Sequence, residues 1–410
     1  MRALFWAGGL LQDFRNLWKK HWIISYGRRQ QGIGNDMKIE FFKHNIGYKE
    51  KRDVSQVLDS VFLTTGDVVY EFERKFSEYI GCEYTIGLMS CTAALHLSML
   101  AYGIGPGDEV ITTPMTFIAT STSILHAGAR PVFVDVEPET GNLNTDLIEK
   151  AITNKTKAIV PVHLYGNMCD MRGIRRIADR HGLVVIEDAA HAVEAQRNGY
   201  KVGELSDAAC FSFYATKSIT CGEGGAVSVH NQQKAKLLRE LSLHGMTKGA
   251  AGRYAGRYNH WDMKMLGWKY NMSNIQAALL MNQIAHIEKL WKKRDRIARR
   301  YEKAIVKIEG MDFPKVPADA KSGRHLFTIW VDPKKRDTIL SGLQAAGVGV
   351  AVNYRAIHLL TYFKKILGHK RGDFPVAEKI GDSTISLPLY PKLTIEEVDC
   401  IIRRVKQLAG

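Results

Sequence analysis

Short apolar runs alternate with helical stretches through the middle of this chain, and the alternation limits the folds open to it. The runs DEVITTP, RPVFVDV, TKAIVPVHL and LVVIEDA are typical of strands, and each of the first three gaps between them carries a helical stretch. Strands and helices in alternation form a mostly parallel sheet with helices on its faces. We therefore expect an α/β fold that binds its ligand at the carboxyl ends of the strands.

The last third of the chain changes pattern. From about Ile284 it reads HIEKLWKKRDRIARRYEKAI, a long charged helix, followed by the strand-like HLFTIWVD and by a closing amphipathic helix that starts near Thr394. We expect this part to form a smaller C-terminal α+β domain. With 410 residues, 45% of them apolar, the chain can bury one large core and a smaller one.

Lys217 lies in the segment FSFYATKSITCGEGG, between two strand-like runs. The uncharged run ACFSFYAT suits a buried strand, which places Lys217 at the end of that strand. Burial disfavours the ammonium form of a lysine and makes its amine available to attack an aldehyde. The alternative is a solvated lysine without chemistry, which is the usual state of this residue type.

Two further segments favour a reactive lysine. Leu183 to Ile186 form a short apolar strand that delivers Asp188 at its carboxyl end, where a carboxylate can keep a ring nitrogen protonated, as the pyridine of pyridoxal phosphate requires. Upstream, Tyr84 to Met89 predict a strand and Thr92 to Tyr102 a helix, whose N-terminal N–H groups attract an anion such as phosphate. Each carboxylate or hydroxyl could instead be a plain helix cap.

These segments resemble a known family. The motifs SCTAALHLSMLAYGIGPGDEVITTPMTFIAT, ARPVFVDVEPETGNL, TKAIVPVHLYGNMCDM, VIEDAAHAVEA, FSFYATKSITCGEGG, LHGM, GWKYNMSNIQAA and ISLPLYP are similar, in this order, to those of the DegT/DnrJ/EryC1/StrS group of nucleotide-sugar aminotransferases. The resemblance implies the pyridoxal-phosphate transferase fold type I. It implies a large cofactor-binding domain of residues 37–285, with a mostly parallel seven-stranded sheet, and a small domain of residues 286–410.

The resemblance also implies a role for individual residues. Lys217 is expected to bond covalently to pyridoxal 5'-phosphate, and Asp188 to pair with its pyridine nitrogen. Ser212 and Thr92 are expected to bind the phosphate, together with the backbone of Cys91, Thr92 and Ala93. The remaining assignments are Phe117 stacked on the pyridine ring, His191 near the ring hydroxyl, Asn271 reaching the phosphate of a neighbouring subunit, and Arg355 and His358 on the substrate.

The activity that follows is transfer of an amino group from an amino acid, glutamate by family expectation, to a nucleotide-linked keto sugar. KYNMSNIQAA and GEGG resemble transaminases that act at C4 of a 4-keto (6-deoxy) sugar, as aminoarabinose-type enzymes do. The products of such enzymes serve cell-surface polysaccharides, lipopolysaccharide or antibiotic sugars. The resemblance also implies a cytoplasmic homodimer with shared active sites.

Three alternatives stay open or are disfavoured on specific residues. A cyclitol or aminoaromatic-precursor aminotransferase would carry the same cofactor motifs. A regulatory, non-catalytic relative should have lost the lysine, the aspartate or the phosphate residues, whereas this chain keeps Lys217, Asp188, Ser212 and Thr92. A deoxygenating branch of the family carries histidine in place of Lys217 and is disfavoured.

Charge and cysteine content exclude other classes. The net charge is +15, but the Lys and Arg residues scatter over several helices and form no nucleic-acid motif, so we expect no nucleic-acid partner. The basic balance suits a phosphorylated substrate and cofactor. The six cysteines show neither a CxxC pair nor a metal-ligand spacing, which predicts free thiols in a reducing compartment and no metal.

Residues 1–36 stand outside the family match and carry a net charge of +4, from six Lys and Arg and two Asp. Their longest uncharged run, Ala3 to Gln12, is too short to span a bilayer. We expect one of three situations: a start at Met37, an arm at the dimer surface, or a basic, Trp-rich interfacial helix.

Overall fold

The computed structural model describes residues 38–247 and 260–409, and residues from Lys38 onward form one compact unit. The N-terminal extension of residues 1–36, for which we considered three situations, lies outside the described residues. Within the described ranges no helix has the length and apolar character needed to cross a membrane.

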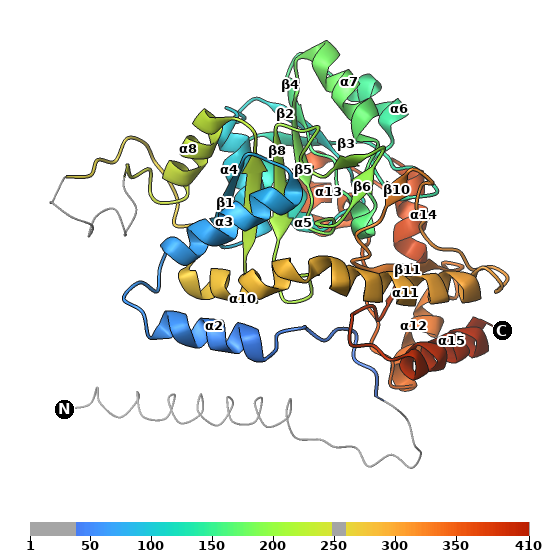
Figure 1. Cartoon of the computed structure of the whole chain (residues 1–410). Coiled ribbons are helices and arrows are strands. Elements are labelled where there is room, and N and C mark those ends of the chain that lie inside the picture. The colour runs from blue at the N-terminus through green and yellow to red at the C-terminus, as the bar shows by residue number, and fades with distance from the viewer. Residues whose placement is uncertain (1–37, 248–259, 410) are drawn as a thin grey trace, which may run out of the picture. The chain divides into compact units, whose positions relative to one another are not determined.

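A seven-stranded sheet forms the centre of the fold (Figure 1). Its strands β8, β5, β4, β2 and β3 run parallel to one another, while β9 runs antiparallel to both of its neighbours, β1 and β8. The predicted mostly parallel seven-stranded sheet of fold type I is confirmed. In spatial order the strands are β1 (Tyr84–Leu88), β9 (Gly225–Val229), β8 (Ala208–Ser212), β5 (Val184–Asp188), β4 (Thr156–Ile159), β2 (Glu109–Thr112) and β3 (Arg130–Phe133).

Helices cover both faces of this sheet, because its strands are apolar on both sides. Side chains alternate between the faces along each strand: Val185 and Phe211 enter one core, whereas Ile186 and Cys210 enter the other. Helices α3 (Asp67–Ile80), α7 (Met171–His181) and α10 (Asn274–Ala285) cover the first face. Helices α4 (Cys91–Ala101), α5 (Ile118–His126) and α8 (Gln232–Leu241) cover the second.

The sequence pattern predicted that Lys217 lies at the end of a strand, and this prediction is wrong. Strand β8 ends at Ser212, and Lys217 belongs to the loop that leads to β9. This loop closes on itself, since the N–H of Lys217 donates to the carbonyl of Tyr214 and the N–H of Cys221 to that of Phe213. The turn therefore begins earlier than the apolar run suggested.

The C-terminal region has its own core. Helix α11 (Ile287–Ile305) packs with α12 (Arg336–Ala345), α15 (Ile395–Ala409) and the antiparallel pair β11 (Phe327–Trp330) and β12 (Thr384–Leu387). A break at His286 separates α10 from α11, at the predicted domain boundary, which itself stays a prediction.

Smaller elements complete the described chain. Strand β10 (Ala320–Lys321) pairs with β6 (Gln196–Arg197), which also pairs with β7 (Tyr200–Lys201), so the C-terminal region is hydrogen-bonded to the large one. The others are α2 (Tyr48–Leu58), α6 (Thr145–Ile148), η1 (Glu149–Ala151), η2 (Leu164–Gly166), η3 (Ile357–Leu359), α13 (Thr361–Leu367) and α14 (Pro375–Ser383). Helix α2 runs alongside α10 (Figure 1).

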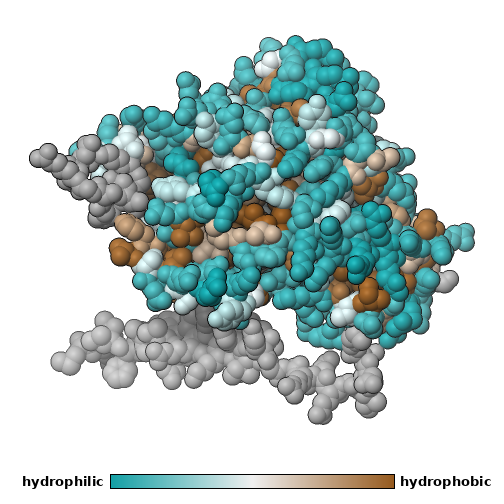
Figure 2. Space-filling model, in the orientation of Figure 1, coloured by the Kyte–Doolittle hydropathy of each residue, from teal (hydrophilic) through white to brown (hydrophobic). Residues whose placement is uncertain are grey.

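The face seen in Figure 2 is mostly hydrophilic, with hydrophobic residues gathered in separate patches. Several large hydrophobic side chains are exposed near the end of α2 and beyond it, among them Leu58, Val61 and Leu63. Patches of this kind often mark contact surfaces with other protein chains.

A cluster of phenylalanine rings joins α3 to the strand that precedes the Lys217 loop. Phe76 of α3 is fully buried, and its ring centroid lies 5.0 Å from that of Phe211 and 5.4 Å from that of Phe213. Both pairs are edge-to-face, the geometry that aromatic rings prefer. These contacts anchor the start of the loop that carries Lys217.

Replacement of Phe76 by Ala should lower the free energy of unfolding by about 3–5 kcal/mol, the usual cost of a cavity left by a buried phenylalanine. Urea denaturation monitored by circular dichroism measures the change. Phe76→Leu, which keeps most of the volume, should lose clearly less. Tyr362→Ala removes an exposed aromatic side chain and should stay within about 0.5 kcal/mol. Equal losses for all three variants would contradict the packing described for Phe76.

Candidate active site

A cavity of about 530 Å³ opens at the carboxyl ends of the central strands. It collects residues that are far apart in the sequence, from Phe41 to the segment before η3. Of the residues predicted for the site, it is lined by Cys91, Thr92, Phe117, Asp188, His191, Ser212 and Lys217. The other lining residues include Phe41, Ser90, Tyr214, Thr216, Glu223, His325, Asn353 and Tyr354.

The amine of Lys217 is held in a dry environment. Burial lowers the pKa of Lys217 from its ordinary value to about 8, although the nearby charge of Asp188 acts in the opposite direction. Its Nζ lies 3.4 Å from Nε2 of His325. A lysine with this pKa has a substantial neutral fraction near neutral pH, so its amine can act as a nucleophile and as a proton acceptor.

Asp188 is the last residue of β5, and its carboxylate is buried at the base of the cavity. Oδ2 accepts a hydrogen bond of 2.7 Å from Thr120 Oγ1, and Oδ1 accepts one of 3.2 Å from the N–H of Ala190. Burial raises the pKa of Asp188, and these hydrogen bonds oppose the rise. A positively charged group beside the carboxylate would stabilise its ionised form.

The N-terminal end of α4 borders the same cavity. Ser90 caps the helix, because its Oγ accepts the N–H of Ala93, so Ser90 has the plain capping role that the sequence left open. The N–H groups of Cys91 and Thr92 belong to the first turn, which has no acceptor within its own helix. These groups, the hydroxyl of Thr92 and that of Ser212 are suited to hold a phosphate.

Gly225 allows this helix end to lie against the sheet. A Cβ at Gly225 would come within 2.4 Å of the backbone nitrogen of Cys91 and within 2.3 Å of the carbonyl carbon of Ser90. No side chain fits in that space. The first residue of β9 therefore has to be glycine if the end of α4 is to reach the cavity.

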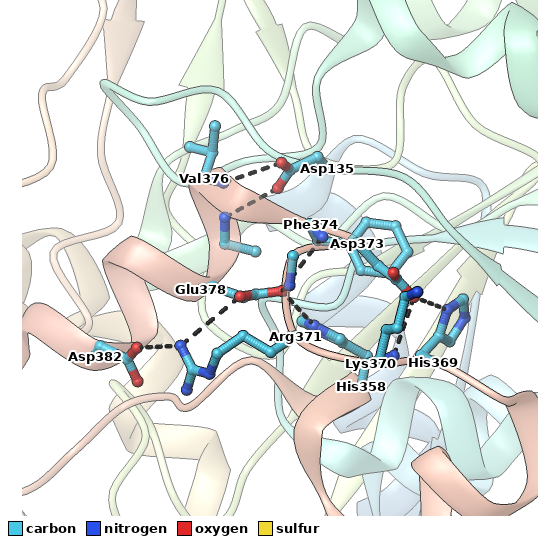
Figure 3. Close-up of polar contacts among 12 residues, drawn as sticks. Asp135, His358, His369, Lys370, Arg371, Asp373, Phe374, Val376, Glu378 and Asp382 are labelled. Atoms are coloured by element: carbon cyan, nitrogen blue, oxygen red, sulfur yellow. Dashed lines mark hydrogen bonds and ion pairs between the residues drawn. The ribbon is translucent and has the colours of Figure 1, made fainter.

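Four predicted site residues do not line the cavity. One is Ala93, whose N–H donates to Ser90 Oγ and is therefore not free for a phosphate. His358 is fully buried and its Nε2 lies 3.0 Å from Oε1 of Glu378, in a polar network whose members do not line the cavity (Figure 3). Arg355 is exposed and does not line the cavity. Asn271 bonds within its own chain to Thr65 and Lys269, so its role toward a neighbouring subunit stays a prediction.

That network fixes the segment around α14. Glu378 Oε1 also accepts the N–H of Gly372, and Asp135 accepts the N–H groups of Val376 and Ala377 at the start of the helix. Figure 3 shows these contacts converging on the turn before α14. His358 is thus a packed histidine that does not line the cavity.

Sequence patterns missed several polar residues that line the cavity or contact its lining residues. Thr120 orients Asp188 from α5, His325 contacts Lys217 from the segment before β11, and Tyr354 lines the cavity. Each stands in a segment without a distinctive local pattern, so only the tertiary fold reveals its position.

The residues present fit pyridoxal phosphate. The cavity combines a buried lysine amine of lowered pKa, a buried carboxylate that favours a neighbouring cation, and a helix end able to hold a phosphate. Phe117, which is 53% exposed, offers a ring face beside them. Fold and site together define a fold type I pyridoxal-phosphate enzyme.

Comparison with known proteins gives the family. Residues 44–406 match the model of the DegT/DnrJ/EryC1/StrS aminotransferase family. The chain belongs to this family and is a pyridoxal-phosphate-dependent aminotransferase.

Individual relatives are similar to this chain over nearly the whole length of both proteins. The chain is 40% identical to the spore coat polysaccharide biosynthesis protein SpsC of Bacillus subtilis, over 88% of this chain and 95% of SpsC. The pyridoxal-phosphate form of the putative sugar aminotransferase Spr1654 from Streptococcus pneumoniae has a TM-score of 0.85 at 32% identity, over 91% of this chain and 99% of Spr1654. PseC of Helicobacter pylori is an aminotransferase involved in the biosynthesis of pseudoaminic acid. It has a TM-score of 0.85 at 27% identity, over 91% of this chain and 99% of PseC.

The rate at which cofactor-free protein takes up pyridoxal phosphate should rise with pH and level off above about 8. Only the neutral amine of Lys217 attacks the aldehyde, and below its pKa the neutral fraction falls about tenfold per pH unit. Stopped-flow absorbance between pH 6.5 and pH 11.5 measures the midpoint. N-acetyl-lysine methylamide serves as the control, with a midpoint of about 10.4. A protein midpoint at the control value would contradict the lowered pKa.

Proposed function

We propose that this aminotransferase moves an amino group from an amino acid, with glutamate as the expected donor, to the keto group of a nucleotide-linked sugar. The position is C4 of a 4-keto (6-deoxy) sugar, and the product enters a polysaccharide or an antibiotic sugar. The observation that carries the proposal is the joint placement of Lys217 and Asp188 in one cavity of a chain that is 40% identical to SpsC over most of both proteins.

The chemistry of the reacting carbon depends on one cofactor property: bound pyridoxal phosphate withdraws electrons from the carbon next to the amino nitrogen. The chain supplies the proton transfers. Lys217 Nζ, once neutral, can take the proton from Cα of the amino-acid donor and later deliver a proton to the former keto carbon of the acceptor. Its pKa of about 8 suits both directions near neutral pH.

Other side chains would bind and orient the cofactor. Asp188, fixed by Thr120, keeps the ring nitrogen protonated and so sustains the electron withdrawal. The helix end at Cys91 and Thr92, with Ser212, would bind the phosphate, and Phe117 would cover one face of the ring. Burial of Lys217 and Asp188 keeps water away from the reacting atoms.

Support for a sugar acceptor comes from relatives. SpsC is named for polysaccharide biosynthesis, PseC for pseudoaminic acid and Spr1654 as a putative sugar aminotransferase. The C4 assignment rests on the resemblance of KYNMSNIQAA and GEGG to C4 enzymes. A catalytic function is favoured over a regulatory one because Lys217, Asp188, Ser212 and Thr92 all line one cavity.

The proposal is tested with a panel of 4-keto and 3-keto sugars linked to UDP, dTDP or GDP, together with a keto-cyclitol, each incubated with glutamate and the loaded enzyme. Mass spectrometry should detect an amino sugar from at least one 4-keto substrate and none with Lys217→Ala. An amino product only from a 3-keto sugar would contradict the C4 assignment. Product only from a keto-cyclitol would favour the cyclitol alternative, and no product from any ketone would favour a regulatory protein.

We further propose a homodimer in the cytoplasm whose active sites are shared, with Asn271 binding the cofactor phosphate of the neighbouring subunit. Asn271 lies outside the cavity of its own chain and donates a hydrogen bond to Thr65, just before α3. The six cysteines are all unpaired, as in a reducing compartment.

Mixing two inactive variants tests the shared site. Lys217→Ala and Asn271→Ala should each be inactive or nearly so alone, whereas a mixed dimer regains one intact site per dimer. Subunits are exchanged in mild denaturant, and light scattering verifies the dimer. Lys217→Ala mixed with Asp188→Ala is the matched control. This mixture should regain no intact site, because both residues act within the cavity of one chain. Activity absent from the first mixture, or an active monomer, would contradict the role of Asn271.

A further inference from the structure

Three aromatic or imidazole side chains that line the cavity lie close together, and a fourth is buried next to them. His191 and His325 lie with ring centroids 4.4 Å apart, and the ring of Tyr354 lies nearly parallel to that of His191, with an angle of 17°. Tyr165 lies behind them, almost fully buried. His191, His325 and Tyr354 line the cavity itself.

Hydrogen bonds fix the tautomer of His191. Its Nδ1 accepts the backbone N–H of Tyr165 at 3.3 Å, so this nitrogen carries no proton. Burial and the nearby charge of Lys217 keep the pKa of His191 well below its usual range, so the ring is neutral. The single ring proton therefore resides on Nε2, which lies 3.2 Å from the hydroxyl of Tyr354.

The same logic fixes the direction of the Tyr354 proton. Because His191 Nε2 donates, the phenol oxygen of Tyr354 accepts, and its own proton cannot point toward His191. Tyr354 is half-buried, and its ring lies 5.8 Å from that of Phe117 on the exposed side of the cavity. The O–H is thus available to a ligand that enters from that side.

The side chain of Asn353 hydrogen-bonds to the neighbouring Tyr354 and belongs to the same polar group. Its Oδ1 is buried and finds no hydrogen-bond donor among the described residues, although the residue lines the cavity. A buried acceptor without a donor is costly. A bound molecule with hydroxyl groups would supply one.

We propose that Tyr354 donates its phenol proton in a hydrogen bond to the carbonyl oxygen of the acceptor substrate, and that His191 is the positioning residue that holds the phenol in this orientation. The inference rests on the proposed function, since it names the partner of that substrate's keto group.

The chemistry balances without net consumption of the tyrosine. Transfer of an amino group to a ketone breaks the carbon–oxygen double bond and forms a bond from carbon to nitrogen. The oxygen leaves as water, whose two hydrogens come from the amine that is transferred. Tyr354 polarises the carbonyl and relays a proton to its oxygen, and it regains that proton from the nitrogen.

Tyr165 positions both His191 and the segment that carries Tyr354. Its backbone N–H binds His191, and its hydroxyl donates to the carbonyl of Asn353 at 2.7 Å, one residue before Tyr354. Its carbonyl also accepts the N–H of His325 at 3.2 Å. Tyr165 adopts a φ of 60°, a conformation that costs a non-glycine residue energy and persists only where the surroundings enforce it.

The two half-reactions separate the role of Tyr354 from a general defect. In single-turnover absorbance experiments, Tyr354→Phe should slow the reaction of the amine-loaded enzyme with its ketone about 100-fold, the usual cost of one well-placed donor. Its reaction with glutamate should slow at least tenfold less. Equal slowing of both halves, or of neither, would overturn the proposal. A wild-type enzyme inert toward every sugar ketone would instead refute the proposed function.

Two variants of His191 test the positioning role. His191→Gln can still offer an N–H near the position of Nε2, whereas His191→Phe cannot. The ketone half-reaction should be slowed by His191→Phe about as much as by Tyr354→Phe, with partial recovery in His191→Gln. The double variant His191→Phe/Tyr354→Phe should lose no more than either single variant, since the two residues act as a unit. Additive losses would overturn the pairing.

A readout on cofactor-free protein is independent of activity. Nitrogen-15 NMR of histidine-labelled protein should show one bare and one protonated nitrogen for His191 between pH 6 and pH 9, with assignment from His191→Gln. Tyr354→Phe should shift the Nε2 proton signal and leave the bare nitrogen bare. A doubly protonated His191, or a proton on Nδ1, would overturn the proposal.

Discussion

Removal of water from two ionisable groups is the physical constraint on which the site depends. Burial moves the pKa of Lys217 down and that of Asp188 up, so each group is displaced toward its neutral form. Such burial is costly unless partners compensate for it. Thr120 and the N–H of Ala190 compensate the carboxylate, and the cofactor, when bound, would provide its positive partner.

The central sheet holds these buried groups close together. Five parallel strands end at the same edge of the sheet, so Asp188 at the end of β5 and Ser212 at the end of β8 are neighbours although 24 positions separate their numbers. Phe72 and Phe76 of α3 pack edge-to-face against Phe213, which directly follows β8. The polar site thus stands on a rigid apolar base.

The sequence could predict what local patterns encode. Apolar runs and their spacing predicted the central strands, and the position of Asp188 after such a run predicted its place in the cavity. The resemblance to a family predicted the cavity positions of Phe117 and His191. Thr120, His325 and Tyr354 could not be found this way, because their proximity to Lys217 and Asp188 arises from contacts between distant segments. Arg355 and His358 were predicted to contact the substrate, but they do not line the cavity. A short motif shows residue types and does not show which side of the chain faces the site. His358 instead contacts Glu378.

One feature of the sheet bears on how the chain folds. Strand β9 inserts between β1 and β8, and its register places Leu88 opposite Gly225, which lies against the start of α4. The end of α4 that is suited to phosphate is therefore completed by a strand synthesised more than 130 residues later. Contacts of such long range form slowly, since a large loop must close first. Competence to bind the cofactor consequently arises late in folding, and a chain that has acquired its cofactor has already inserted the antiparallel strand into the sheet.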